Sequence, residues 1–188
     1  KKLLACAKHF AVHSGPEWSR HSLNLDNLSN RDLWETYLPA FKSLVQKGNV
    51  AEVMCAYQRI DGEPCCSNTH YLQQILRKEW GFKGMVVSDC SAISDFWIKG
   101  RHEVSANAAD ASARAVIAGT DVECGSNFKN LPDAVKAGKI TEKQIDESVV
   151  KLLTARFDLG DFDGDAQNPY RKIPMSVVAS KKHKDLAL

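Results

Sequence analysis

Several sequence features are absent from this chain, and each absence excludes a class of protein. No apolar run approaches the roughly 20 residues that a membrane-spanning helix needs, so we expect no membrane partner. No glycine-rich phosphate-binding fingerprint occurs, which argues against a nucleotide-binding fold. No two cysteines have the Cys-x-x-Cys spacing typical of a zinc site, and we expect neither a metal nor another cofactor.

The chain also has little net charge, because 25 Lys and Arg residues nearly balance 23 Asp and Glu residues and leave a formal charge of +2. A strongly basic surface is the usual requirement for nucleic-acid binding, so we expect no nucleic-acid partner. Hydrophobic residues make up 44% and charged residues 26%, as in an ordinary globular domain. A leader-like segment is missing, and the abrupt start leads us to expect a fragment of a longer protein.

Six cysteines are spread along the chain. We expect Cys6, Cys55, Cys90 and Cys124, which lie in or beside predicted strands, to be small buried hydrophobic residues. The adjacent pair at 65–66 lies in a predicted loop, where either cysteine could form a disulfide. The sequence leaves the disulfide state open.

Runs that predict strands alternate with segments of helical periodicity. The predicted strands are residues 3–10, 50–57, 85–87 and 119–124. The predicted helices are residues 31–48, 69–80, 106–118, 131–137 and 141–156, the last opened by a capping box. This alternation is typical of a parallel α/β sheet with its strands in chain order and helices outside. A complete eight-stranded barrel usually needs about 250 residues, so the chain is either half a barrel or a small doubly wound sheet.

The stretch from Gly81 to Asp89 is the most informative. Residues 85–87 are apolar and predict a strand covered on both faces, and Asp89 follows directly. A carboxylate at the carboxyl end of a parallel strand lies where α/β barrels keep their catalytic groups. The ordinary alternative is that Asp89 only caps the next helix.

Two other predicted strands end in polar side chains, at Lys8, His9 and Tyr57. Because parallel strands end at the same edge of a sheet, we expect these side chains to meet Asp89 in one cleft suited to a sugar. Each also has an ordinary explanation: Lys8 as a solvated charge, and His9 and Tyr57 as hydrogen-bonded core residues.

Three motifs resemble glycoside hydrolase family 3. They are residues 8–10 (Lys-His-Phe), 53–57 (Val-Met-Cys-Ala-Tyr) with 61–64 (Asp-Gly-Glu-Pro), and 81–89 (Gly-Phe-Lys-Gly-Met-Val-Val-Ser-Asp). Their order and spacing are similar to the second half of that family's catalytic barrel domain. The resemblance implies a partial (β/α)8 TIM-barrel-like fold, with about the last four β/α units in residues 1–160. Residues 161–188 would be a linker and the start of the next, α/β sandwich domain.

The resemblance also implies an activity. Family members are retaining, exo-acting β-glycosidases that release terminal sugars from an oligosaccharide or aryl β-glycoside through a covalent glycosyl-enzyme. Asp89 matches the nucleophile, with Tyr57 expected to orient it by a hydrogen bond and Lys8 to keep it ionised. The positions that match the sugar subsite are Lys8, His9, Arg20, Met54 and Tyr57, with Met54 as the expected apolar wall.

The chain departs from the family pattern at Cys90, where many members have Trp. The Ser-Asp-Cys form resembles the β-xylosidase and related β-glucosidase branch. The residues after His9 do not match the β-N-acetylglucosaminidase branch, so we expect the acid/base to be a carboxylate in the following domain. That domain and the first half of the barrel are the expected partners, and by resemblance the protein would be periplasmic or secreted.

A retaining glycosidase needs a nucleophile and an acid/base carboxylate, and this chain matches only the nucleophile, so the isolated chain should be inactive. One alternative is therefore a noncatalytic carbohydrate-binding or structural α/β fragment, and a weaker one is an unrelated doubly wound binding protein. The sequence does not distinguish xylose, glucose and arabinose, and it does not reveal the oligomeric state.

Overall fold

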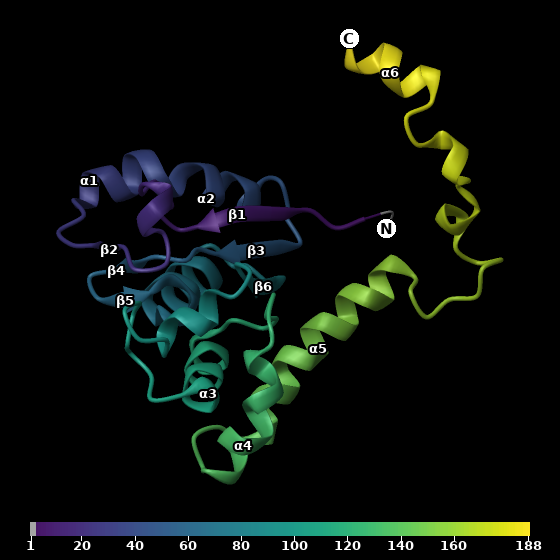
Figure 1. Cartoon of the computed structure of the whole chain (residues 1–188). Coiled ribbons are helices and arrows are strands. Elements are labelled where there is room, and N and C mark those ends of the chain that lie inside the picture. The colour runs from purple at the N-terminus through teal and green to yellow at the C-terminus, as the bar shows by residue number, and fades with distance from the viewer. Residues whose placement is uncertain (1–2) are drawn as a thin grey trace.

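The computed structural model describes residues 3–188. Its main sheet has three parallel strands, β1 (Cys6–Phe10), β3 (Glu52–Cys55) and β6 (Met85–Ser88), which lie side by side in chain order (Figure 1). All four residues of β6 are buried, as expected for a strand that is covered on both faces. The predicted parallel α/β arrangement is confirmed for these three strands.

The helices lie between and after these strands. The longer ones are η4 (His70–Glu79), α2 (Leu38–Gln46), α3 (Ala108–Ala118) and α5 (Glu142–Leu159), and the shorter α-helices are α1 (Asn30–Asp32), α4 (Leu131–Lys136) and α6 (Lys181–Ala187). Single turns and short segments of helix are η1 (Glu17–Ser19), η2 (Leu33–Tyr37), η3 (Cys65–Ser67), η5 (Ala92–Phe96), η6 (Asn127–Asn130), η7 (Pro169–Lys172) and η8 (Met175–Val177). Helix α2 packs against β1 and α5 against β6.

Local signals in the sequence explain where two of these elements begin. Thr141 and Gln144 form the predicted capping box at the start of α5. The connection into β6 needs Gly84, because a Cβ atom there would overlap the carbonyl oxygen of Ala51. The sheet and its nearest helices are therefore fixed by short-range signals that the sequence displays.

The prediction of a fourth strand over residues 119–124 is wrong, because this segment does not form a regular strand. Only an isolated parallel bridge joins Val122 to Val87. The Asp121 side chain explains the difference, because its Oδ2 accepts the backbone N–H of Val86 at 2.9 Å, where a regular ladder would use a backbone carbonyl. The segment still lies beside β6, since the N–H of Ser88 donates to the carbonyl of Val122 at 2.9 Å.

Two stretches expected to be loops contain a second, small sheet. It consists of β2 (Asn24–Leu25), β4 (Arg59–Ile60) and β5 (Glu63–Pro64), with β2 parallel and β5 antiparallel to β4. Strands of two residues are too short to show an alternating pattern, so no periodicity could reveal them. The sheet joins the segment after β1 to the segment after β3.

The expectation that four cysteines are simply buried hydrophobic residues is wrong, because three of them form disulfides and only Cys55 of the four is buried, while Cys90 is exposed. Cys55 forms a disulfide with Cys66, and Cys90 forms one with Cys124. Cys6 is free and only half-buried, and Cys65 is free and buried. Strand periodicity predicts burial but does not show which sulfur atoms become neighbours. The disulfide pairing could therefore be assigned only from the folded structure.

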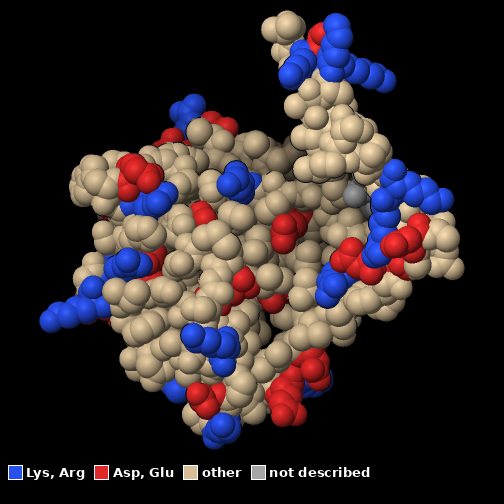
Figure 2. Space-filling model, turned by 45° about the vertical axis from the view of Figure 1, so that its right-hand side comes forward, with Lys and Arg blue, Asp and Glu red and all other residues tan. Residues whose placement is uncertain are grey.

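Some apolar residues remain on the surface. In the first helical segment Trp34 and Leu44, which follow the helical pattern, are 41% and 46% exposed, and Phe157 on α5 is 64% exposed. Beyond α5 the chain runs away from the sheet (Figure 1). On the face that Figure 2 shows, basic and acidic side chains are interspersed. Among the helices that the structure describes, none has both the length and the apolarity that crossing a membrane requires.

Candidate active site

Asp89 lies at the carboxyl end of β6. Its backbone N–H donates to the carbonyl of Cys55 at 3.1 Å, and its Oδ1 accepts the N–H of Cys90 at 2.8 Å. The residue is 8% exposed. It is not the N-cap of the following short helix η5, which begins after Ser91. The carboxylate is therefore held by the backbone around it and keeps Oδ2 for another partner.

That partner is His9, whose Nε2 lies 3.3 Å from Oδ2 of Asp89. A bulge in β1 places it there: Ala7 pairs with Val53 and Phe10 pairs with Cys55, so β1 uses one residue more than β3 over the same distance. Burial lowers the pKa of His9, although the Asp89 carboxylate works in the opposite direction. The imidazole is therefore a mainly neutral hydrogen-bonding group near pH 7.

Tyr57 lies two residues beyond β3. Its hydroxyl donates to the carbonyl of Cys90, the residue directly after Asp89, at 2.7 Å, and it also lies close enough to the Asp89 carboxylate to interact with it. Burial and then the neighbouring Asp89 carboxylate raise the pKa of Tyr57 to about 12. The phenol therefore stays protonated and ties the end of β3 to the backbone beside Asp89.

The other predicted subsite residues differ in how near they come to this cluster. The Arg20 guanidinium lies over the Tyr57 ring, 5.2 Å from its centre, and forms an ion pair with Glu17 at 2.8 Å. Met54 is half-buried on β3. Lys8 is exposed, and among residues 3–188 no hydrogen bond or ion pair joins it to Asp89. The roles of Lys8 and Met54 stay predictions.

Two histidines near the cluster were not singled out from the sequence. The His13 ring lies 4.7 Å from the His9 ring, and its Nδ1 lies 3.2 Å from Oε1 of Gln58. The His21 ring meets the edge of Tyr57, with ring centres 4.8 Å apart. Both lie in the polar stretch after β1, and their closeness to Arg20 in the sequence was the only signal that could have found them.

The comparisons with known proteins agree with this architecture. Residues 1–155 match the family described as Glycosyl hydrolase family 3 N terminal domain. The chain belongs to this family. Its resemblance to glycoside hydrolase family 3, read from three motifs, is thereby confirmed.

Similar members of family 3 are named as xylosidases and glucosidases. A xylan 1,4-beta-xylosidase of Xylanibacter ruminicola is 54% identical over 100% of this chain and 22% of its own length. A probable exo-1,4-beta-xylosidase of Neosartorya fischeri is 38% identical over 99% of this chain and 25% of its own length. The chain therefore spans about a quarter of the length of these relatives.

Solved family 3 structures share the fold. A GH3 exo-beta-xylosidase in complex with a xylobiose aziridine probe has a TM-score of 0.90 and 31% identity, over 98% of this chain and 24% of that one. The beta-glucosidase of Listeria innocua in complex with glucose has a TM-score of 0.82 and 28% identity, over 98% and 25% of the two chains. The expected partial TIM-barrel-like fold is confirmed.

In this family 3 domain, the unusual Cys90 has a structural partner. Its disulfide to Cys124 ties the residue after Asp89 to the end of the segment that follows α3. Two hydrogen bonds lie alongside, from Ser91 N–H to the carbonyl of Cys124 at 2.7 Å and from Cys124 N–H to Ser88 Oγ at 3.1 Å. The backbone on both sides of Asp89 is thus fixed to its neighbouring segment.

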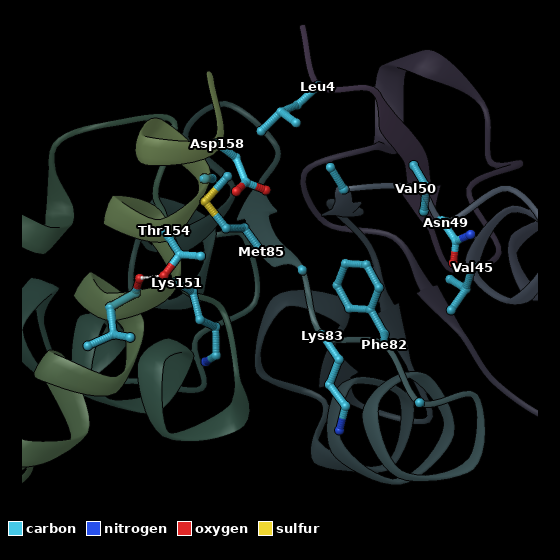
Figure 3. Close-up of a pocket in the computed structure, with 15 residues that line it drawn as sticks. Leu4, Val45, Asn49, Val50, Phe82, Lys83, Met85, Lys151, Thr154 and Asp158 are labelled. Carbon is cyan, nitrogen blue, oxygen red and sulfur yellow. Dashed lines mark hydrogen bonds between the residues drawn. The ribbon is translucent and has the colours of Figure 1, made fainter. Parts of the chain in front are cut away.

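A cavity of about 390 Å³ lies elsewhere in the domain (Figure 3). It lies between the sheet and α5, and its lining includes Leu4, Phe82, Met85 and Lys151. Leu4 and Met85 mark the amino ends of β1 and β6, so the cavity opens opposite Asp89. Within residues 3–188 no group of three or more His, Cys, Asp or Glu side chains is placed to hold a metal ion.

Proposed function

We propose that the protein containing this chain is a retaining, exo-acting β-glycosidase of the β-xylosidase or β-glucosidase type, with Asp89 as its nucleophile. The observation that carries the proposal is the position of Asp89 at the carboxyl end of a central parallel strand, 3.3 Å from His9. Barrel enzymes keep their catalytic groups at this end. A xylosidase is favoured over a glucosidase, because the relative that is 54% identical is named a xylan 1,4-beta-xylosidase.

The proposed chemistry has two displacement steps. An Asp89 oxygen forms a bond to the anomeric carbon while the glycosidic bond breaks and the leaving oxygen takes a proton from an acid. Water then attacks the same carbon and gives a proton to the conjugate base of that acid, the bond to Asp89 breaks, and the sugar leaves with its β configuration. Two inversions give the retention of configuration that defines this class.

Residues of the chain would serve these steps by binding the sugar. Arg20 offers N–H donors above the Tyr57 ring. Nδ1 of a neutral His9 can accept from a sugar hydroxyl while Nε2 contacts Asp89, and Lys8 offers a cation at the same strand end. Met54 would supply the apolar wall. Tyr57 would hold the backbone after Asp89 through its hydrogen bond to Cys90.

The proton donor is proposed to lie outside this chain, in the next domain, of which residues 161–188 would be the linker and the start, and the first half of the barrel would complete the sugar site. Gly160 ends α5 in a left-handed conformation, so the helix stops where the proposed linker begins. The two disulfides support a periplasmic or secreted location, because disulfides persist in oxidising compartments. A noncatalytic role is less favoured, since the similar relatives are named as hydrolases.

A mechanism-based fluorosugar tests the proposal. The protein from the complete reading frame should hydrolyse an aryl β-xyloside with retention of configuration, followed by proton NMR, and 2-fluoroxylosyl fluoride should label Asp89, located by peptide mass spectrometry. Residues 1–188 alone should give no turnover. Label on a different residue, or an inverted product, would remove Asp89 from the nucleophile role.

A further inference from the structure

A fully buried carboxylate lies behind the site and has no part in the mechanism described above. Asp95, in η5, has 0% exposure. Its Oδ2 accepts from Nδ1 of His21 at 2.9 Å, and its Oδ1 accepts from the guanidinium of Arg101. A buried carboxylate costs free energy unless it is paired, and here both oxygens have a partner. Asp95 therefore fixes the orientation of the His21 ring.

The orientation of His21 decides what its second nitrogen can do. When Nδ1 of His21 carries the proton and donates it in a hydrogen bond to Asp95, Nε2 of the neutral ring is an acceptor. Nε of Arg20 donates to this Nε2 in a long hydrogen bond of 3.4 Å. The His21 and Arg20 side chains also share one support, since the ring of His21 lies 4.8 Å and the guanidinium of Arg20 5.2 Å from the centre of the Tyr57 ring.

Arg20 also has a partner on the solvent side. Its ion pair with Glu17 joins two exposed side chains, 39% and 76% accessible, and exposed pairs hold geometry weakly. The His21 contact connects Arg20 to the buried carboxylate of Asp95. Without it, the long Arg20 side chain would keep only the weak outward pair and its contact with the face of Tyr57, and its polar end would have to be ordered again whenever a sugar binds.

We propose that His21 and Asp95 are positioning residues that hold the Arg20 guanidinium over Tyr57, ready to bind the sugar beside Asp89. The inference rests on the proposed glycosidase function and adds two residues to its sugar site. Neither residue touches the reacting atoms. Their contribution is the order that they impose on Arg20 before the sugar arrives, so it belongs to binding and should appear in KM more than in kcat.

A double-mutant cycle tests this proposal in the protein from the complete reading frame, with 4-nitrophenyl β-xylopyranoside as the substrate. His21→Phe keeps a flat ring but removes both nitrogens, and Arg20→Ala removes the guanidinium. Each should raise KM about tenfold, the loss of one hydrogen bond to a charged group. The double variant should show no larger rise in KM than Arg20→Ala alone, because His21 acts through Arg20.

Two further variants add a partial rescue and a control to the double-mutant cycle. His21→Gln should recover part of the lost affinity, because its amide oxygen can accept from Arg20. His70→Phe is the matched control: it makes the same change at an exposed histidine and should leave KM unchanged. Additive KM effects of His21→Phe and Arg20→Ala, or an unchanged KM in His21→Phe, would overturn this inference alone. Absence of hydrolysis by the unsubstituted protein would overturn the proposed function and the inference together.

Discussion

The Nε2 atom of His9 lies 3.3 Å from Oδ2 of Asp89, so the end of β1 contacts the end of β6 across β3. Burial lowers the pKa of His9, and the nearby carboxylate offsets only part of that lowering. The contact is therefore a hydrogen bond between a neutral imidazole and a carboxylate near pH 7. Asp89 gains a partner there without the full neutralising charge of a cation.

Asp89→Asn should lower kcat on an aryl β-xyloside by about 10⁴-fold or more, because an amide has nearly the same shape but is a poor nucleophile. Circular dichroism should show an unchanged fold. The matched control is Asp61→Asn, at an exposed loop carboxylate, which should keep normal turnover. Near-normal kcat in Asp89→Asn would contradict the assigned role.

Replacing both Cys90 and Cys124 by Ser should reduce the free energy of unfolding by about 3–4 kcal/mol, the loop-closure contribution of a disulfide that spans this length. The two residues are 34 apart in the sequence and flank the backbone of Asp89, so turnover should also fall. Urea denaturation and kinetics on the same samples would measure both effects. Cys6→Ser, at a free and half-buried cysteine, should change stability by less than about 1 kcal/mol.

The arrangement of the site could be predicted from the sequence where it follows from strand direction. Residues 85–87 are apolar and lead directly to Asp89, and parallel strands bring their carboxyl ends together, so His9 and Asp89 meet as expected. The partner of His21 could not be predicted, because Asp95 lies 74 residues away on a short helix with no distinctive pattern. Contacts of that kind depend on side-chain directions that only the packed fold defines.

Asp121 is the clearest stability feature that the sequence did not reveal. Its side chain is fully buried and accepts from Arg77 at 2.6 Å and Lys151 at 2.6 Å, besides the N–H of Val86. Asp121→Ala should lower the free energy of unfolding by about 3–5 kcal/mol, because both cations and the backbone donor lose a partner in the interior. Urea denaturation would measure the loss. Asp133→Ala removes an exposed ion pair and should cost no more than about 1 kcal/mol.

His102 should make the stability of the fold depend on pH. Burial, with help from Arg59, lowers the pKa of its ring to about 3, and neither ring nitrogen has a partner among the described residues. Between pH 3 and about 6.5, the unfolded chain therefore binds one more proton than the folded chain, and stability falls by about 1.4 kcal/mol for each pH unit of acidification.

Urea denaturation at two pH values tests this assignment. Between pH 7 and about pH 4.5, the unsubstituted protein should lose roughly 2–3 kcal/mol more of its unfolding free energy than His102→Gln does. Only the pH dependence is compared, so any direct cost of the substitution cancels. Parallel pH profiles for the two proteins would contradict the assignment.

The bulge in β1 has a consequence for sequence variation. Ala7 and Phe10 both face the core although they are three residues apart, and Lys8 and His9 occupy the extra step between them. A single deletion in this stretch would make the strand regular and would keep Ala7 and Phe10 on the same face, but it would leave one residue between them where Lys8 and His9 now lie. The spacing between Ala7 and Phe10 therefore makes room for both Lys8 and His9 at the strand end. Alignments of homologues should contain no gap between these two positions.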